Sequence, residues 1–450
     1  MVVPSPPAKQ PVSFTVTSLI GKIQEVFANL PDGRKTATAN NLKYTMQDAA
    51  MSAFSVFFTQ NPSFLDYQTR MQKKFGKNNA QSVFGVHKIP SANQIRNLLD
   101  PVAPENVFPL LQEIDDGLYQ NGYLEPFRSI GNTLLVAIDG TDFFSSKKIC
   151  CPHCRKQTLK NGETLYRHST ITPVIVAPGQ EHVIPLPPEF IYLQDGNEKQ
   201  DCELNAGKRW LNAWGKHYSP WSVTLMGDDL YSHQSYCEAV IAEGFHLLMV
   251  CKPDSHALLY EWIADFEQAG KIQVVERTRR ERGRQLTERY RYMNQVPLRD
   301  SDDALMLNWC ELTVTDPQGK TRYKNAWVTT HAIHDGNVAH IATAGRARWK
   351  VENENNNVLK NQGYHFDHNF GHGKEHLSNL LATLILLAYL VHTTLEWMDE
   401  TYHTIRRLLP SRRTFFEHLR ALTQYLPFDN WEHLMAFMLN GLEPESPDTS

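Results

Sequence analysis

Two continuous apolar runs that each end on an aspartate constrain the fold of this sequence most. Residues 133–138 (TLLVAI) lead directly into Asp139, and residues 221–226 (WSVTLM) lead through a glycine into Asp228. A short apolar run that stops at a turn residue is typical of a buried strand. We therefore expect both aspartates at the carboxyl-terminal ends of strands, where functional groups gather in an α/β sheet.

The surrounding pattern predicts an α/β fold with a mixed sheet flanked by helices. Further strands at 170–176 and 246–250, with a helix at 233–243 between them, continue the alternation of strand and helix. Before them, apolar spacing of three and four predicts a helical N-terminal region, with Ser91 as one helix cap. Later segments predict short strands (272–277, 288–293, 306–314 and 326–330) and then helices (338–359, 377–407 and 415–439).

A chain of 450 residues is long enough for several lobes. Four prolines among the first eleven residues predict a disordered start. The expected organisation is a disordered N-terminus (1–13), a helical N-terminal domain (14–128), an α/β core in two parts (129–265 and 334–396), a β-rich insertion (266–333) and a C-terminal helical region (397–450).

Composition indicates a cytosolic protein. Hydrophobic residues make up 41% and charged residues 21%, as in a soluble globular chain. The apolar run 377–391 is shorter than the roughly 20 residues that cross a bilayer, so we expect a buried helix and no membrane partner. The start has no secretory pattern, and seven cysteines do not form an even disulfide framework. The net charge of −4 argues mildly against a nucleic-acid partner unless basic residues cluster.

The two aspartates and a third acid predict a site for divalent cations. Oxygen ligands from Asp139, Asp228 and Glu352 suit Mg²⁺ or Mn²⁺. Two such ions about 3.5–4 Å apart can activate a nucleophile and stabilise the leaving oxygen of a phosphodiester. Either aspartate alone is more simply a turn residue, and the metal interpretation depends on all three acids together.

Arg348 lies four residues before Glu352, so the two share a face of the predicted helix 338–359. An arginine beside a metal site can hold a phosphate through two hydrogen bonds. By spacing alone, an ordinary surface ion pair is the simpler interpretation.

Three segments, taken in order, resemble the DDE transposases of bacterial insertion sequences. They are residues 138–141 (IDGT), 227–231 (GDDLY) and 348–353 (RWKVEN). The closest resemblance is to the large group with a β-strand insertion between the second aspartate and the glutamate. The likeness covers roughly residues 133–395, and the β-rich segment 271–333 stands where that insertion would lie. It implies a ribonuclease H-like core, and by position it makes the helical N-terminal domain the site-specific DNA-binding part.

The resemblance also implies roles for single residues. Asp139, Asp228 and Glu352 become the catalytic carboxylates and the ligands of two Mg²⁺ or Mn²⁺ ions, and Arg348 becomes a DNA contact. Three nearby acids are lower-ranked alternative ligands: Asp142, Asp229 and Glu354.

The sequence departs from the signature of that group at two positions. Gly345 stands where the signature has a tyrosine, and Leu359 stands where it has a lysine. Lys360, one place later, is the candidate replacement as a phosphate contact.

The implied reaction is hydrolysis at transposon ends, which frees a 3′-hydroxyl, followed by attack of that hydroxyl on target DNA at the same site. The implied partners are double-stranded DNA (transposon ends and target) and a second copy of the chain, because synapsis joins two ends. The implied location is the cytoplasm, in association with the nucleoid. Two alternatives stay open: a ribonuclease H-like nuclease or resolvase that cuts without joining, and a domesticated DNA-binding protein that has lost catalysis.

A dense basic stretch compensates for the negative net charge. Residues 277–299 hold eight arginines, interleaved with two tyrosines, and this pattern favours contact with a DNA backbone. Arg279, Arg280 and Arg282 are the principal candidates. The alternative is a solvated hairpin.

Cys151 and Cys154 form a Cys-x-x-Cys pair that resembles half of a structural zinc site. His168 and Cys202 are the nearest candidates for the other half, and a lone pair of this kind is weak evidence. A histidine-rich segment, residues 365–376, contains glycines that interrupt any helix, so it predicts a tight turn and not a metal site.

Overall fold

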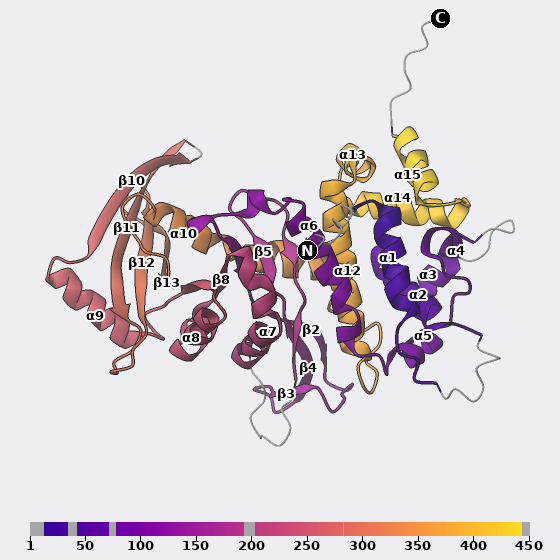
Figure 1. Ribbon diagram of the computed structural model, residues 1–450, viewed down its shortest axis with the longest axis horizontal. Helices are drawn as coiled ribbons and strands as arrows, with labels where there is room; N and C mark the ends of the chain where they lie inside the picture. The colour runs from indigo at the N-terminus through magenta and orange to yellow at the C-terminus, as the bar shows by residue number, and fades with distance from the viewer. Residues whose placement is uncertain (1–12, 35–42, 72–77, 193–202, 282, 443–450) are drawn as a thin grey trace, which may run out of the picture. The chain divides into compact units, whose positions relative to one another are not determined.

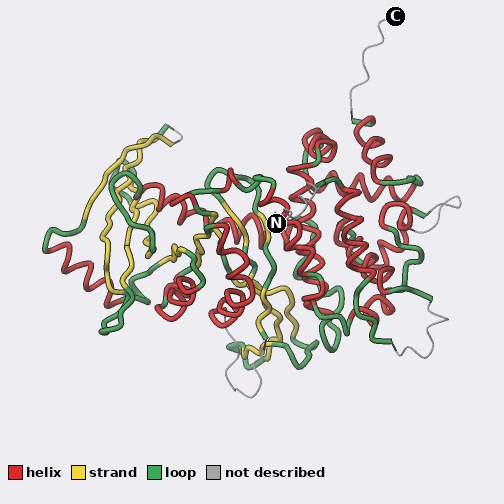
Figure 2. Tube along the Cα trace, viewed as in Figure 1, coloured by secondary structure: helices red, strands yellow, loops and turns green. Residues whose placement is uncertain are grey.

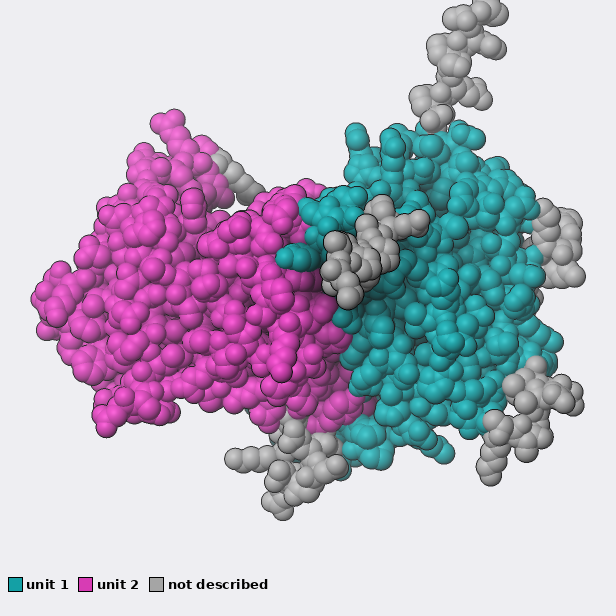
Figure 3. All heavy atoms as spheres, viewed as in Figure 1, with its two compact units in different colours: residues 1–123, 143–167, 357–450 teal, residues 124–142, 168–356 magenta. Residues whose placement is uncertain are grey.

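The chain folds into two compact units, which Figure 3 shows in different colours. The computed structural model describes residues 13–34, 43–71, 78–192, 203–281 and 283–442. The helical unit comprises residues 1–123, 143–167 and 357–450, and the sheet unit comprises residues 124–142 and 168–356. The C-terminal helices thus belong to the same unit as the N-terminal helices, which the sequential division did not anticipate. Most of the predicted disordered start lies outside the described residues.

The sheet unit is built on a nine-stranded mixed sheet, visible as the larger group of strands in Figure 2. The strand order is β10-β11-β12-β13-β9-β8-β1-β5-β6. The bounds are β1 (Leu134–Ala137), β5 (Val174–Val176), β6 (Ile184–Pro185), β8 (Val223–Gly227), β9 (His246–Val250), β10 (Gln273–Glu281), β11 (Arg284–Pro297), β12 (Met306–Thr315) and β13 (Thr321–Thr329). The α/β class and the mixed sheet are therefore as predicted.

The register of the central strands brings the two predicted acid positions to one edge. β1 runs parallel to β8, with Ala137 opposite Met226, and β8 runs parallel to β9. On its other side, β1 pairs antiparallel with β5, and β5 pairs antiparallel with β6. The residues of β1 and β8 are fully buried, because both faces of the sheet are covered.

The predicted β-rich insertion extends the same sheet. β13 pairs antiparallel with β9, and β12, β11 and β10 follow by antiparallel pairing (Figure 1). Helix α9 packs against β11, and α10 packs against β9, β11 and β12. The helices of this unit are α7 (Glu203–Tyr218), α8 (Gln234–Ala242), α9 (Ala257–Gln268) and α10 (Val338–Ala347), with 3₁₀ turns η3 (Glu125–Phe127), η4 (Ile130–Asn132), η5 (Ser219–Trp221) and η6 (Asp229–Ser232) and the π-helix η7 (Val351–Asn356).

Several predicted elements are wrong in detail, and among them the helix predicted at 415–439 is two helices, α14 (Arg412–Tyr425) and α15 (Trp431–Asn440). The segment 170–176 is not one strand: it contains the end of β4 (Thr164–Ile171) and all of β5, with Pro173 between them. Proline has no N–H to donate and fixes its own φ, so the chain leaves one sheet there and enters another. The predicted helix 338–359 is interrupted, since α10 ends at Ala347 and a π-helix follows before α11 (Asn357–Asn361).

A second, four-stranded sheet was not predicted. It contains β2 (Gly140–Ser146), β3 (Arg155–Thr158), β4 and β7 (Glu189–Ile191), with β4 between β2 and β3. β3 carries polar and charged side chains at every position, so no apolar run marks it in the sequence.

The helical unit confirms the predicted N-terminal helices. Its helices are α1 (Val16–Ala28), α2 (Met46–Phe58), α3 (Phe64–Met71), α4 (Asn79–Phe84), α5 (Ala92–Leu99), α6 (Phe108–Gln120), α11, α12 (Leu377–Met398), α13 (Glu400–Leu408), α14 (Arg412–Tyr425) and α15 (Trp431–Asn440), with the 3₁₀ turn η2 (Pro104–Asn106). Ser91 caps α5 through a capping box with Gln94, as its position predicted. Phe58 on α2 packs against His392 and Trp431, with ring centroids 4.6 and 5.3 Å apart. This contact ties the two ends of the chain into one core.

Helix α12 is the most apolar element of the chain. Its 22 residues meet the length and composition of a membrane span, but 94% of its most apolar window is buried inside the protein. A helix that is buried on all sides is expected at the centre of a soluble protein, and the burial of α12 is consistent with that. The predicted helix 377–407 ends early because Asp399 starts α13, where its carboxylate accepts the N–H of Tyr402 at 3.0 Å.

Candidate active site

The sheet unit places Asp139 and Asp228 directly after neighbouring parallel strands. Asp139 follows β1 through Ile138, whose N–H donates to the carbonyl of Met226 on β8 at 2.9 Å. The carbonyl of Asp139 accepts the N–H of Thr172 at 3.1 Å. Asp228 caps the turn η6 through a 2.9 Å bond from the N–H of Leu230 to its carboxylate. One Asp228 oxygen is thus held by the backbone, which fixes the side chain at the carboxyl edge of β8.

Glu352 lies on the π-helix η7, near the point where α10 ends. Its carboxylate accepts a 2.6 Å hydrogen bond from the guanidinium of Arg348. The Arg348 side chain is 17% exposed and that of Glu352 is 49% exposed, so the guanidinium is mostly buried and the carboxylate that it binds faces solvent. Single π-helical turns occur frequently at functional sites, because the extra residue changes where side chains project.

Trp327 explains the glycine that replaces the signature tyrosine. A Cβ at Gly345 would lie 2.5 Å from the indole nitrogen of Trp327 on β13. Trp327 is fully buried, so the space that a larger side chain would need is already filled.

The end of η7 is anchored to the sheet unit by a buried amide. The carboxamide oxygen of Asn356 accepts bonds from the Thr172 hydroxyl at 2.9 Å and from the Asn355 side chain at 3.0 Å. Because Thr172 also donates its N–H to Asp139, one residue connects the segment of Glu352 with the loop of Asp139.

The electrostatics of Asp139 identify the groups that surround it. Burial raises the pKa of the Asp139 carboxyl to about 7, Arg348 opposes this shift, and the negative charges of Glu352, Glu203 and Asp228 add to it. Such a raised pKa is expected for a carboxyl that is removed from water and also has other carboxylates near it. Asp228, Glu352 and Arg348 are therefore all near enough to Asp139 to affect the pKa of its carboxyl.

Glu203 is an acid that sequence reasoning missed. It starts helix α7, and its carboxylate would lie 2.3–2.7 Å from a Cβ at position 140. Only the absence of a side chain at Gly140 therefore permits this close approach beside Asp139. No motif marks Glu203, because it lies 64 residues from Asp139 in the sequence, and only the fold brings it near.

The three predicted carboxylates do not form a closed cluster. Among the residues that the structure describes, the group whose potential ligand atoms all lie within 4.8 Å of one another consists of cysteines and histidines, and Asp139, Asp228 and Glu352 are not part of it. The carboxylate of Glu352 is instead paired with Arg348.

Of the alternative acids, Asp229 and Asp142 accept hydrogen bonds from neighbouring segments. Asp229 accepts the N–H of Lys252 and the hydroxyl of Ser255, both at 2.6 Å, and so braces the loop after β9. Asp142 accepts the hydroxyl of Ser169 at 2.5 Å. Glu354 is half-buried on η7.

The basic stretch of the insertion is partly neutralised by its own carboxylates. Arg279 pairs with Glu288 at 2.5 Å and with Glu281 at 2.8 Å. Arg280 is exposed, and no ion pair involving it is found in the described part of the chain. Arg282 lies outside the described residues. Other pairs are Arg289 with Glu276, Arg291 with Glu267 and Glu311, and Arg299 with Asp303.

Lys360, the second predicted phosphate contact, lies on α11 of the helical unit and is half-buried.

The Cys-x-x-Cys pair acquires two histidine neighbours. Cys151, Cys154, His168 and His372 have potential ligand atoms that all lie within 4.8 Å of one another. The sequence had suggested His168, whereas the interpretation of the segment around His372 as a turn without metal ligands did not foresee its place in this group. Cys202 lies outside the described residues.

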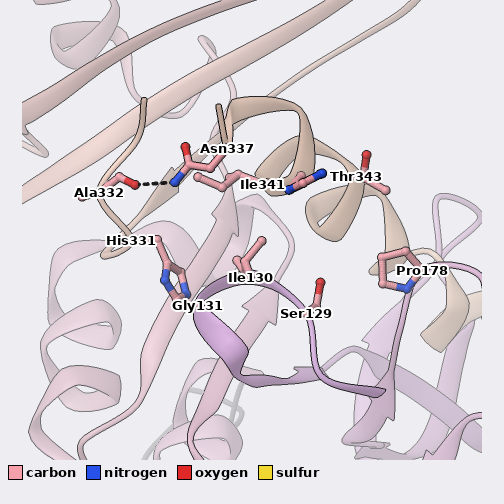
Figure 4. Close-up of a pocket in the computed structure, with 10 residues that line it drawn as sticks. Ser129, Ile130, Gly131, Pro178, His331, Ala332, Asn337, Ile341 and Thr343 are labelled. Carbon is pink, nitrogen blue, oxygen red and sulfur yellow. Dashed lines mark hydrogen bonds between the residues drawn. The ribbon is translucent and has the colours of Figure 1, made fainter. Parts of the chain in front are cut away.

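A cavity of about 530 Å³ lies at the opposite, amino-terminal edge of β1 (Figure 4). Its wall includes Ser129 and Gly131, which precede that strand, and His331, which follows β13. Burial lowers the pKa of His331 to about 4, and its ring accepts or donates a 2.8 Å bond with Thr224. None of the predicted carboxylates lines this cavity.

No protein-family model matches this chain, and no curated protein matches it.

Proposed function

We propose that this protein is a metal-dependent DNA transposase with Asp139, Asp228 and Glu352 as its catalytic carboxylates. The observation that carries the proposal is the placement of Asp139 and Asp228 after adjacent parallel strands, with Glu352 near enough to raise the pKa of Asp139. A turn aspartate in an ordinary loop would have no reason to share its surroundings with three other acids and a half-buried arginine.

The proposal includes a ribonuclease H-like core for the sheet unit. Support comes from the mixed order of β6, β5, β1, β8 and β9 and from the acids at one edge of it. The four insertion strands stand between Asp228 and Glu352 in the sequence, which is where the resemblance puts them. The helical N-terminal segment, 14–128, is proposed to recognise the transposon ends.

The donor set fits two Mg²⁺ or Mn²⁺ ions. All the groups involved offer oxygen atoms, and the crowding of negative charge around Asp139 is relieved by a divalent cation. When bound, such ions supply an activated nucleophile and stabilise the leaving oxygen of the phosphodiester. Asp139, Asp228 and Glu352 would hold them.

Arg348 is proposed to orient Glu352 and to contact a DNA phosphate. Its inner position beside Glu352 leaves the guanidinium fixed, and a fixed guanidinium matches the geometry of phosphate oxygens. Lys360 and the exposed arginines of the insertion are further proposed phosphate contacts. The DNA partners are the transposon ends and the target, and a homodimer is proposed for the synaptic complex.

The test is a reaction with the purified full chain, Mg²⁺ and a plasmid that carries a marker between the two DNA segments flanking this coding region. We expect cleavage at the segment ends with free 3′-hydroxyls, followed by joined products in a second plasmid, both detected by sequencing. Asp139→Asn, Asp228→Asn and Glu352→Gln should abolish both steps. Asp229→Asn should retain them, because the amide oxygen still accepts the N–H of Lys252 and the amide NH₂ can donate to the Ser255 hydroxyl.

Each alternative predicts a different result in the same assay. Cleavage without joined products identifies a nuclease or resolvase. Specific binding of the flanking DNA without cleavage identifies a domesticated DNA-binding protein. If the three acid variants cleave as well as the unmodified protein, the carboxylate assignment is wrong.

A further inference from the structure

The Cys/His cluster (Cys151, Cys154, His168 and His372) has the dimensions of a metal site. The two sulfur atoms of Cys151 and Cys154 are 3.7 Å apart, and Cys154 Sγ lies 3.5 Å from Nε2 of His372. A disulfide would need a sulfur separation of about 2.05 Å, so the two cysteines are not bonded to each other. All six described cysteines are free.

These two distances match tetrahedral coordination of one zinc ion. With Zn–S bonds of about 2.3 Å, Zn–N bonds of about 2.0–2.1 Å and tetrahedral angles, the edges are about 3.8 Å for S···S and about 3.5 Å for S···N. The observed 3.7 and 3.5 Å agree with both. An octahedral oxygen site has neither these ligands nor these spacings.

The local backbone presents the two cysteines as a preformed pair. The chain turns tightly between them, because the N–H of Cys154 donates to the carbonyl of Cys151 at 3.2 Å. The N–H of Cys151 donates to Cys154 Sγ at 3.3 Å, and such bonds stabilise a thiolate. Cys154 is fully buried, so its sulfur is directed inward and not toward solvent.

The histidines come from two other segments. His168 lies on β4, immediately after the Arg167 that pairs with β3, and it is 5% exposed. His372 precedes α12 and packs against Phe144 of β2, with ring centroids 4.4 Å apart and the ring planes tilted by 39°. The strand pairing and the ring contact restrict the directions from which the two imidazoles approach.

We propose that Cys151, Cys154, His168 and His372 bind one structural Zn²⁺ ion. Four protein ligands complete a tetrahedral shell and leave no position for water or substrate, which is the mark of a structural site. The ion would connect the β2–β3 loop, β4 and the segment before α12, so that residues 218 positions apart in the sequence are cross-linked. β2 and β4 both continue to the loops of the candidate active site, since Asp139 precedes one and Thr172 follows the other.

The test is the metal content of the purified full chain, measured by mass spectrometry after growth with added zinc. We expect about one zinc per chain, and loss of most of it in Cys151→Ser, Cys154→Ser and His372→Ala. Cys150→Ser is the matched control, because Cys150 is the exposed neighbour in the same loop and lies outside the cluster. It should keep the zinc.

A second measurement on the unmodified protein covers the case in which the variants do not fold. The metal is removed with a chelator and replaced by Co²⁺, and we expect the intense visible absorption of tetrahedral cobalt together with a sulfur-to-cobalt charge-transfer band. A weak octahedral spectrum, iron in place of zinc, or zinc retained by Cys154→Ser would each overturn the proposal. Because neither readout uses DNA cleavage, the zinc site and the proposed transposase activity can fail independently.

Discussion

The molecule contains two groups of potential metal ligands that differ in almost every physical respect. The carboxylate group uses oxygen atoms and is partly exposed, and within it burial, together with the neighbouring negative charges, raises the pKa of Asp139. The Cys/His cluster uses sulfur and nitrogen atoms, is largely buried, and already has tetrahedral spacing. A closed set of soft ligands suits an ion that stays in place, whereas spaced carboxylates suit ions that share their ligands with a substrate.

The backbone supports this difference. The two cysteines are held by hydrogen bonds within a single turn, and the histidines are held by strand pairing and by a ring contact with Phe144. Glu352 instead lies on a π-helical segment and is held by an arginine, an arrangement that can change when a cation replaces that arginine as its partner. We therefore expect loss of metal to affect folding at the Cys/His cluster and chemistry at the carboxylates.

The largest expected effect is on DNA cleavage. Asp139→Asn and Asp228→Asn should each lower the cleavage rate by a factor on the order of 10³ or more, because a neutral amide is a poor ligand for a hard cation. The zinc content should stay unchanged. Cys151→Ser should have the opposite pattern, with zinc lost and the rate per folded molecule nearly retained. The cleavage rates are measured under single-turnover conditions and corrected for the folded fraction by circular dichroism. Loss of zinc in the aspartate variants would show that the two groups of ligands are not independent.

The next largest effect is on stability as a function of pH in the absence of divalent cations. The folded-state pKa of Asp139 is raised to about 7 from an ordinary value of 3.8. Between these values the folded protein binds more protons on this group than the unfolded chain, so the free energy of unfolding falls as the pH rises, by at most about 4 kcal/mol. Asp139→Asn should remove this slope.

Urea unfolding at several pH values, with and without Mg²⁺, measures the slope. Added Mg²⁺ should flatten it, because the cation replaces the proton as the partner of the ionised carboxylate. A slope of equal size in Asp139→Asn would show that another group causes it. Asp139→Asn has the same Cys/His cluster as the unmodified protein, so any pH dependence from that cluster cancels in the comparison.

The central fold was accessible from the sequence because its signals are local. β9 was predicted with the bounds that it has, and β1 and β8 within two residues, since a buried strand between turn residues needs no distant information. The positions of Asp139 and Asp228 at one edge follow from those strands alone. The insertion strands were also located, although their apolar patterns are shorter than the strands themselves.

What the sequence did not reveal depends on contacts between distant segments. His372 joins Cys154 across 218 residues, and Glu203 reaches Asp139 only because helix α7 packs there and position 140 has no side chain. The π-helical break before Glu352 likewise has no local helix-breaking residue such as proline. Residue spacing and apolar periodicity carry no information about these two contacts or about the π-helical break, so only the three-dimensional structure could reveal them.

A smaller effect is expected at Arg348. Arg348→Ala removes the positive charge that opposes the raised pKa of Asp139, so that pKa should rise further and the stability slope should extend to higher pH. The cleavage rate should fall by about 10- to 100-fold, and Arg348→Lys should recover part of it, because lysine keeps the charge but not the paired hydrogen bonds. Rates at saturating DNA and the DNA dissociation constant, measured separately, distinguish positioning of Glu352 from phosphate binding. A change in the dissociation constant alone would exclude the positioning role.

The smallest expected effect is on DNA binding by the insertion, where arginine side chains are proposed to contact the DNA backbone without a metal ion. Arg280 is exposed and Arg279 is paired with two glutamates, so their side chains are not equally available to DNA. Arg280→Gln should weaken DNA binding irrespective of sequence and reduce the slope of log K against log salt concentration by about 1, whereas Arg279→Gln should change the slope less. Fluorescence anisotropy with a labelled duplex at several salt concentrations measures both, with zinc content and acid-dependent cleavage followed in parallel. Equal slopes for the two variants and the unmodified protein would show that β10 does not contact DNA. The proposed DNA contacts would then be those of the helical unit and Arg348.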